Sequence, residues 1–363
     1  MISACDSCLR RAHLIARLAP RIAGVLQRPP PPGASLFALS DERLIAAVLG
    51  GADVALLAWL ESFDPAAARD RVRRAQAWAV CAHDAAYPAG LGQLADPPAV
   101  LFGVGRLECL EQLRSTPAVT LVGTRRPSPY GSEMARSLGR TLGLAGIVVV
   151  SGLALGIDGD AHRGCVEAGG LPVAVLAGGP DIPYPRRHRW LYRQVLSRGA
   201  VLSELPPRQR AFRWSFPARN RIMAGLAAMT VVVEAAEPSG SLITADFARD
   251  LGRNVGAVPG RVTNRMAAGS NRLLQDGAAV LSGPEDVLDQ IYGVGTRPRQ
   301  EPRLPEDDEL RAVLAAVEEV TDPAAIAGRA GLDAAEARSA LGRLEAEGWI
   351  ARDALGGYER KVL

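Results

Sequence analysis

The alternation of apolar and polar segments predicts a parallel β-sheet in the middle of the chain. Twice in succession a valine-rich run ends at a glycine turn, first at Val122-Gly123-Thr124 and then at Ser151-Gly152. A segment with the periodicity of an amphipathic helix follows each turn. Repeated strand, turn and helix units give a parallel sheet with helices on its faces. Ligands bind at the carboxyl edge of such sheets, so we expect both turns to line the binding crevice.

The same alternation continues to about residue 292. Further strands are expected at residues 200–202, 230–234, 255–258 and 279–281, with helices near residues 189–197, 218–227, 241–251 and 284–291. Six or seven parallel strands would form one doubly wound domain. The predicted fold class is therefore α/β, with the sheet domain over residues 116–292.

Helical periodicity dominates the part of the chain before the sheet. Apolar positions predict a helix within residues 1–28, and the proline run RPPPPG at residues 28–33 marks a boundary. From a helix start at Ser40 we expect helices to about Ala82, with breaks at Gly50-Gly51 and Asp64-Pro65. A short strand at residues 99–103 follows the turn-rich segment that begins HDAAYP, which we assign to packing. Residues 1–115 are thus predicted to be an N-terminal helical region.

The last part of the chain has the layout of a winged helix. Residues 293–308 are rich in glycine, proline and charge, which is typical of a linker. Residues 309–363 follow as helix, helix, turn, helix and a hairpin with a Gly356-Gly357 turn. The third helix carries Arg338 and Arg343 among several glutamates, so contact with DNA and contact with protein both stay open.

Composition indicates a globular protein without a membrane segment. The 363 residues allow two or three domains, and 48% are hydrophobic and 22% charged. No apolar run reaches the roughly 18 residues that span a bilayer, and the N-terminus lacks the apolar core of a signal peptide. We therefore expect a cytoplasmic location. The net charge of +3 permits nucleic-acid binding without requiring it.

The cysteines give no clear metal site in the sequence. Cys5 and Cys8 form the one close pair among the five cysteines, and a disulfide framework is not expected in a cytosolic chain of this size. The pair could be half of a zinc site, but neither a second cysteine pair nor a spaced histidine pair accompanies it. We therefore expect no bound metal.

The first glycine turn lacks the features of a dinucleotide site. Such a site needs Gly-x-Gly-x-x-Gly after the first strand and an acidic residue at the end of the second. Here Gly123 is followed by Thr124, Arg125 and Arg126, and the second strand ends in Ser151. Nicotinamide cofactors are therefore disfavoured, and no cofactor is expected.

Three turns at this edge of the sheet are suited to phosphate instead. Backbone amides at Gly123 and Thr124 can hold an anion beside the guanidinium of Arg125, and Gly152 leaves backbone exposed at the second strand end. In EPSGSLITADF, amides and hydroxyls gather at a helix N-terminus, from Ser239, Gly240, Ser241 and Thr244. Each turn has a purely structural explanation as well, but three together favour a groove for a polyanion.

A pair of acid–base residues lies after the second turn. Asp158 is placed to cap a helix, and His162, one helical turn later, could pair with it. No nucleophile accompanies them, so they do not make a catalytic triad.

Aromatic and basic residues alternate in FRWSFPARNRIMAG. Phe212, Trp214 and Phe216 interleave with a polar set that comprises Arg213, Arg219, Asn220 and Arg221. Aromatic rings that stack bases beside arginines that hold phosphates are what a single-stranded nucleic acid requires. Core aromatics with solvated arginines explain the pattern equally well.

Several blocks between residues 116 and 288 resemble the DprA family of bacterial DNA-processing proteins, also called Smf. They include GTRRPSPYG, VVVSGLALGIDGDAHRG, FPARNRIMAGL and VVEAAEPSGSLITADFARDLGRNVGAVPG. The resemblance implies an extended Rossmann-like fold without a nucleotide cofactor and a non-enzymatic homodimer. It also implies that the protein binds single-stranded DNA without strong sequence preference and loads RecA onto it during natural transformation. The positions that match the family's DNA pocket are Arg125, Phe216, Arg219, Asn220, Arg221, Gly240 and Ser241, whereas Leu155 stands where the family usually has arginine.

Two other function classes stay open. A nucleotide-processing hydrolase of the lysine-decarboxylase-like phosphoribohydrolase type has a related fold, but Leu242 and Ile243 stand where its loop needs glycine and threonine, and Asp246 is the one acid at a suitable distance. A transcription factor built on the winged helix would prefer duplex DNA. Substitution of Arg219 and Arg221 by alanine is expected to weaken single-strand binding.

Overall fold

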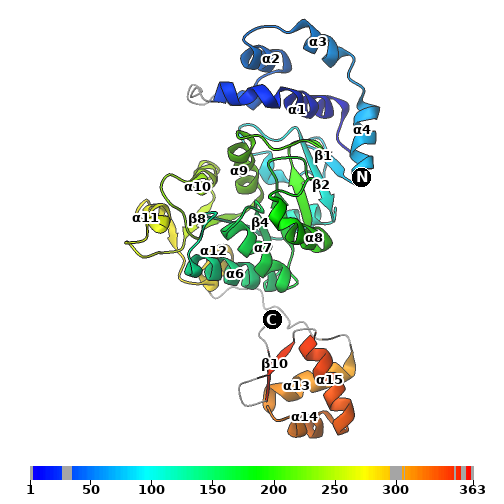
Figure 1. Ribbon diagram of the computed structural model, residues 1–363, viewed down its shortest axis with the longest axis vertical. Coiled ribbons are helices and arrows are strands. Elements are labelled where there is room, and N and C mark those ends of the chain that lie inside the picture. Colours follow the sequence, from blue (N-terminus) through cyan, green and yellow to red (C-terminus); the bar gives the residue numbers. More distant parts are fainter. Residues whose placement is uncertain are drawn as a thin grey trace. The chain divides into compact units, whose positions relative to one another are not determined.

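The computed structural model describes residues 3–26, 35–294, 305, 307–346, 349–352 and 357–360 (Figure 1). The chain forms two compact units, residues 1–297 and residues 298–363. The proline boundary at residues 28–33 lies outside the described residues, as does most of the expected linker. None of the described helices is long and apolar enough to cross a membrane.

The first unit is built on a nine-stranded sheet, and the predicted α/β fold is confirmed. In the described part of the chain the strand order is β1-β2-β6-β5-β4-β3-β7-β8-β9. The strands from β3 onward pair in parallel. They are β3 (Ala118–Val122), β4 (Val148–Ser151), β5 (Pro172–Val175), β6 (Ala200–Ser203), β7 (Met229–Val232), β8 (Asn254–Ala257) and β9 (Ala279–Val280).

The sheet reverses its direction of growth between β3 and β7. Successive strands β4, β5 and β6 are added on one side of β3, whereas β7, β8 and β9 are added on the other. In a doubly wound sheet the loops that leave the carboxyl ends of the two central strands diverge, and they leave a crevice between them. The turns after Val122 and Val232 therefore face a common space.

Two antiparallel strands that the sequence did not predict as part of this sheet extend its edge. β1 (Trp78–Cys81) pairs with β2 (Val100–Gly105), and β2 pairs with β6. The expected helix to about Ala82 is wrong here, because the last helix ends at Arg74. All four residues of β1 are buried, and a short continuous apolar run does not distinguish a strand from a helix by its periodicity.

Helices cover both faces of the sheet (Figure 1). One layer consists of α6 (Pro129–Leu144), α7 (Ile157–Glu167) and α12 (Pro284–Tyr292), and it packs against Val119, Leu121 and Val149 of the sheet. On the same side, α8 (Arg189–Arg198) packs over Ala174 and Val201. Val122, Val148 and Val173 face the opposite layer, which consists of α9 (Ser215–Leu226), α10 (Gly240–Asp250), α5 (Cys109–Ser115) and α11 (Ala268–Gln275). Helices α5 and α11 were not predicted from the sequence. Short 3₁₀ helices are η1 (Leu36–Ala38), η2 (Ala89–Leu91), η3 (Arg186–His188) and η4 (Arg265–Ala267).

Helices α6 and α7 approach each other through glycine. A Cβ atom at Gly139 would overlap the carbonyl oxygen of Ala161, and one at Gly164 would overlap that of Arg136. The two backbones are thus in direct contact, so α7 is held at a fixed height above the sheet.

The N-terminal helices pack onto the sheet domain within the same unit. They are α1 (Asp6–Leu26), α2 (Asp41–Leu49), α3 (Val54–Glu61) and α4 (Pro65–Arg74). The hydroxyl of Ser40 accepts the N–H of Arg43, as the expected helix start requires. Trp214 and Leu205 complete the apolar core of α1 to α3, and the indole Nε1 of Trp214 donates to the carbonyl of Ala19 at 2.8 Å.

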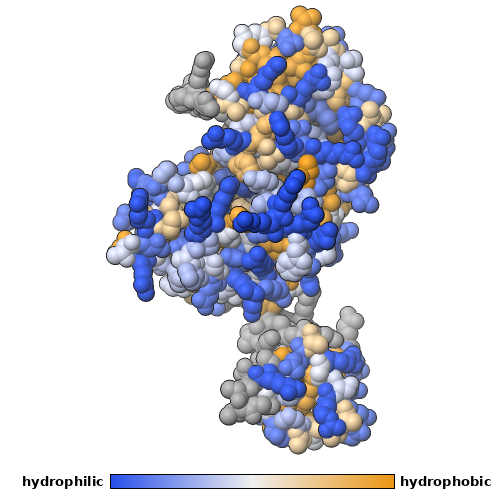
Figure 2. Space-filling view, in the orientation of Figure 1, coloured by the Kyte–Doolittle hydropathy of each residue, from blue (hydrophilic) through white to orange (hydrophobic). Residues whose placement is uncertain are grey.

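The N-terminal helices and the sheet domain differ in how many hydrophobic residues they expose. Figure 2 shows hydrophobic residues gathered over the N-terminal helices, whereas the visible face of the sheet domain is mainly hydrophilic. Val54, at the start of α3, is 81% exposed. Polar side chains therefore dominate the part of this face that belongs to the sheet domain.

The described residues of the second unit form three helices and a two-stranded antiparallel sheet in the predicted order. They are α13 (Asp308–Glu319), α14 (Pro323–Ala330), α15 (Ala334–Ala346), β10 (Ile350–Arg352) and β11 (Tyr358–Arg360). Leu314, Ile326 and Leu341 lie in its core. Gly356, in the expected hairpin turn, lies outside the described residues, and the assignment as a winged helix stays a prediction.

Candidate nucleic-acid interface

A pocket of about 440 Å³ opens where the sheet changes direction. Its walls come from the loops after β3 and β7 and from the first turns of α9 and α10. Most of the residues that the sequence singled out line it together: Gly123, Thr124, Arg125, Phe216, Arg219, Asn220, Ser239, Gly240, Ser241 and Thr244. Segments more than 100 residues apart in the chain thus form one site, as expected for the crevice of a doubly wound sheet.

Backbone hydrogen bonds fix the first glycine turn against the loop after β7. The N–H of Thr124 donates to the carbonyl of Glu234 at 2.6 Å, and the carboxylate of Glu234 accepts the N–H of Ser128 at 2.7 Å. A side chain at Gly123 would collide with Ile157 and with the same carbonyl. The turn is therefore rigid, and it presents Arg125 to solvent at the rim of the pocket.

Arg219 supplies a buried positive charge at the pocket wall. Its guanidinium donates to the carbonyl of Val175 and, at 3.2 Å, to the side-chain oxygen of Asn220. Burial lowers the pKa of Arg219 to about 10, and the nearby Asp158 carboxylate opposes that shift. The group remains protonated at neutral pH, so the pocket keeps a fixed cation with few water contacts.

Ser151 and Gly152 do not line the pocket. The hydroxyl of Ser151 donates to the carbonyl of Leu121 at 2.6 Å. A Cβ atom at Gly152 would occupy the space of the Arg219 guanidinium, so this glycine leaves room for the arginine. Direct contact of either residue with DNA stays a prediction.

Asp158 binds backbone and does not cap its helix. The N-terminal cap of α7 is Gly156, in the left-handed region with φ of 78°. The Asp158 carboxylate accepts the N–H of Gly152 at 3.1 Å, and burial raises its pKa while Arg219 opposes the shift. None of the hydrogen bonds in the described part of the chain joins Asp158 to His162.

The N-terminus of α10 closes the pocket on the other side. Ser239 caps the helix by accepting the N–H of Ser241, and the Asn220 amide donates to the carbonyl of Gly240 at 2.9 Å. Thr244 lines the pocket, and its buried hydroxyl has no hydrogen-bond partner among the described residues. A helix N-terminus with free polar groups attracts anions.

Aromatic rings and arginine meet at the pocket mouth. The guanidinium of Arg125 lies over the ring of Phe216 at 5.4 Å, and the ring of Tyr184 lies 5.4 Å from that of Phe216. Tyr184 is 46% exposed and was not among the expected site residues. Its signal in the sequence is the run YPRRHR, an aromatic followed by arginines, and the exposed Arg186 and Arg187 continue the basic surface.

Arg221 does not belong to the pocket, although it lies two residues after Arg219. Its guanidinium is 2% exposed and forms a paired contact with Glu204, at 2.6 and 3.1 Å, and a bond of 3.0 Å to Asp96. Positions two apart point to different sides of a helix. These partners raise the pKa of Arg221, whose role is to join α9 to the loop at Asp96 and to the end of β6.

Leu155, at the position of the family's usual arginine, is half-buried in the loop that leads into α7. Its neighbour Ala154 lines the pocket. This side of the pocket therefore carries an apolar residue next to the charged wall.

Comparison with known proteins gives consistent matches. The family model described as DNA recombination-mediator protein A matches residues 78–292. Protein Smf of Escherichia coli is 37% identical over 287 residues, which cover 76% of this chain and 75% of that protein. Protein Smf of Synechocystis is 39% identical over 211 residues, or 58% of this chain, and the match spans only 53% of that relative's length.

Two solved structures share the fold. DNA processing protein A from Streptococcus pneumoniae has a TM-score of 0.61 and 31% identity, covering 78% of this chain and 95% of its own. DNA processing protein A from Helicobacter pylori has a TM-score of 0.53 and 27% identity, covering 59% of this chain and 95% of its own, and its structure is described in terms of a unique single-stranded DNA binding mode.

Proposed function

Because the chain belongs to the DNA recombination-mediator protein A family, we propose that its pocket binds single-stranded DNA without strong sequence preference. The observation that carries the proposal is the convergence of Arg125, Phe216 and Arg219 with the N-terminus of α10 in one pocket. The relative from Helicobacter pylori, which is described as binding single-stranded DNA, supports it.

The pocket offers separate groups for phosphate and for base. Arg219 and the amide of Gly240 are suited to a phosphate, which gains most from a charged partner that water reaches poorly. Phe216, which is half-buried, and Tyr184, which is exposed, offer aromatic rings to bases, and stacking on an aromatic ring is sequence-tolerant because every base has a π-face. Such a division of contacts favours a flexible single strand over a duplex, whose bases are already stacked.

We further propose that the protein acts as a homodimer in the cytoplasm and passes the bound strand to RecA for recombination of incoming DNA. This part rests on the resemblance of the sequence blocks to the DprA family. The description of the family, which refers to recombination mediation, and the name of the Streptococcus pneumoniae relative, which refers to DNA processing, support it.

The proposed role is non-enzymatic. Among the residues that line the pocket the one carboxylate is Asp158, which is engaged by the N–H of Gly152. Asp246, the acid that a phosphoribohydrolase would need, is exposed on α10 and is not among the lining residues. A general base must reach the proton that it abstracts, and neither carboxylate is placed to do so. This geometry disfavours the hydrolase alternative.

The test is fluorescence anisotropy with labelled oligo-dT over a salt series. Substitution Arg125→Ala should weaken binding about tenfold and reduce the magnitude of the salt slope by about 0.7, as expected for one lost phosphate contact to a single strand. Substitution Phe216→Ala should weaken binding by a similar factor with the slope unchanged, because stacking releases no counterion.

Arg140→Ala is the matched control, since Arg140 is an exposed arginine on α6 that pairs with Glu167. Its binding and salt slope should equal those of the unchanged protein. Equal loss in Arg125→Ala and Arg140→Ala would show that net charge alone drives binding and would remove the pocket from the proposal. Tighter binding to a duplex of the same length would favour the transcription-factor alternative.

A further inference from the structure

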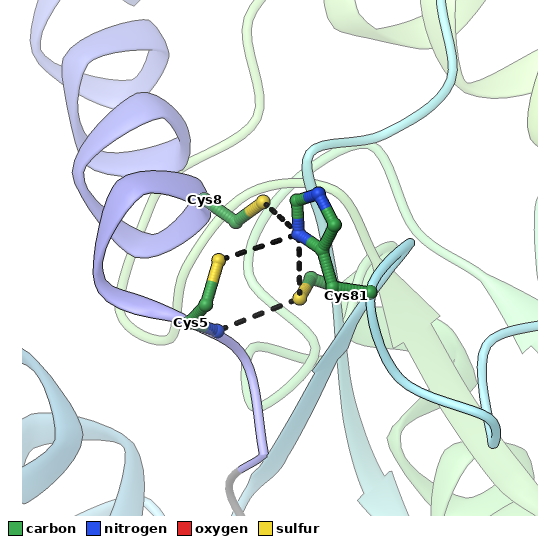
Figure 3. Close-up of side chains that lie close together, drawn as sticks. Cys5, Cys8 and Cys81 are labelled. Carbon is green, nitrogen blue, oxygen red and sulfur yellow. Dashed lines mark hydrogen bonds between the residues drawn. The ribbon is translucent and has the colours of Figure 1, made fainter.

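Four potential metal ligands lie together at the sheet edge that carries β1, away from the pocket. They are Cys5, Cys8, Cys81 and His83, and their ligand atoms all lie within 4.8 Å of one another (Figure 3). We propose that these residues, the Cys₃His cluster, bind a structural zinc ion.

The cluster joins two segments that are far apart in the sequence. Cys5 directly precedes α1 and Cys8 lies in its first turn, whereas Cys81 ends β1 and His83 follows in the next turn. Figure 3 shows the side chains of Cys5 and Cys8 directed toward the strand that carries Cys81. The other two cysteines, Cys109 and Cys165, are buried apart from the cluster in the core of the sheet domain.

The spacing of the donor atoms fits tetrahedral zinc. Nδ1 of His83 lies 3.4 Å from Sγ of Cys5, 3.5 Å from Sγ of Cys8 and 3.8 Å from Sγ of Cys81. Zinc–sulfur bonds of about 2.3 Å and zinc–nitrogen bonds of about 2.0 Å, placed at the tetrahedral angle, separate sulfur and nitrogen by about 3.5 Å. The three distances from Nδ1 of His83 lie close to that value, so the arrangement is compatible with one ion bonded to all four atoms.

The surroundings support thiolate ligands. The N–H of Cys5 is directed at Sγ of Cys81 at 3.4 Å, and the hydroxyl of Ser7 lies 3.3 Å from Sγ of Cys5. Donors directed at sulfur stabilise the charge of a metal-bound thiolate and orient it. Backbone bonds from Ser3 and Ala4 to the carbonyl of Ala79, at 3.0 and 3.3 Å, hold the two segments in register next to the cluster.

The ligand set identifies the metal class and the role. Three thiolates and one imidazole in a tetrahedron select zinc over the hard cations, which prefer oxygen ligands. Four protein ligands leave no coordination position for substrate, which is the property of a structural site and not of a catalytic one. The ion would fasten α1 to the edge strand β1, with Cys81 fully buried beneath it and His83 exposed above it.

The test is the metal content of the full-length, untagged protein purified under reducing conditions. Elemental mass spectrometry should find about one zinc per chain, and replacement of the zinc by Co²⁺ should give the visible absorption of a tetrahedral thiolate complex. Cys8→Ser should lose most of the zinc. Cys109→Ser, which changes a free cysteine outside the cluster, should keep it.

A ligand-preserving change keeps the test decisive if Cys8→Ser does not fold. His83→Cys retains four ligands, so it should keep the zinc and should shift the charge-transfer absorption of the Co²⁺ form, because a fourth thiolate replaces the imidazole. Folded protein without zinc and without a tetrahedral Co²⁺ spectrum would overturn the proposal. A Cys5–Cys8 disulfide in the reduced, purified protein would overturn it as well.

Discussion

Two arginines of α9 show how burial and partners decide a residue's role. Arg219 lines the pocket with a guanidinium that no carboxylate contacts within 4 Å among the described residues, whereas Arg221 is bonded to Glu204 and Asp96. Both belong to the same block of sequence, FPARNRIMAGL, and both are nearly fully buried. A double substitution would therefore mix a loss of binding with a loss of folding, so each residue needs its own measurement.

We expect Arg221→Ala to reduce the free energy of unfolding by about 3–5 kcal/mol, because it leaves the Glu204 carboxylate buried without its partner. Urea unfolding followed by circular dichroism measures this loss. Arg140→Ala, which breaks only an exposed pair, should change the free energy by less than about 0.5 kcal/mol. An unfolding midpoint for Arg221→Ala equal to that of Arg140→Ala would contradict the assigned role.

His162 should make stability depend on pH. Burial lowers the pKa of His162 to about 3 in the folded protein, with further contributions from His188 and Arg219. The unfolded chain has the ordinary value of about 6.5 and binds a proton first as pH falls, so the stabilisation is complete above that value and is lost below it. Between pH 7.5 and pH 5 the loss amounts to about 2 kcal/mol.

The measurement is the difference between the unchanged protein and His162→Gln, each unfolded by urea at several pH values. The difference removes the contributions of other groups, including Asp158, whose raised pKa acts in the opposite direction as pH rises above about 3.8. The stability curves should converge or cross as pH falls from 7.5 to 5. Parallel curves would mean that His162 gains a proton without cost in the folded state.

At the scale of elements, the contact between α6 and α7 depends on residues without side chains. We expect Gly164→Ala to destabilise the protein by about 1–3 kcal/mol, because the added methyl group must push the helix away from the carbonyl of Arg136. Thermal unfolding measures the change.

Gly24→Ala is the matched control for that substitution. Gly24 lies in α1 with no atom within 4 Å of an added Cβ, so the change should stabilise its helix by about 0.5–1 kcal/mol. A lower melting temperature in both variants would show that the loss at Gly164 is not specific to the contact between α6 and α7.

At the scale of the whole molecule, the sequence predicts the doubly wound sheet and its crevice well because local and global signals agree. Each valine run, glycine turn and amphipathic helix appears where the structure has it, and Gly123 and Gly240 fall at one sheet edge. The edge strand β1 was missed because its four apolar residues carry no periodicity. Its identity as a strand depends on its pairing with β2, which follows about 20 residues later in the chain.

The Cys₃His cluster shows the same limit for the prediction of binding sites from sequence. A search for a second close pair or a spaced histidine pair overlooks Cys81 and His83, which are separated by one residue and stand more than 70 residues after Cys5. Only the pairing of the N-terminal segment with β1 brings them together. Arg221 is the opposite case: its sequence context matches that of a binding residue, whereas its burial and its pairing with Glu204 are visible only in three dimensions.

The position of β1 also bears on aggregation through the edge of the sheet. An outermost strand presents unpaired backbone groups to other molecules and is a template for aggregation. Here β1 is only four residues long, and the N–H groups of Ser3 and Ala4 occupy the outward carbonyl of Ala79. Residues 3 and 4 therefore cover part of the open side of β1, and whatever fastens them there also limits pairing of this edge with another strand.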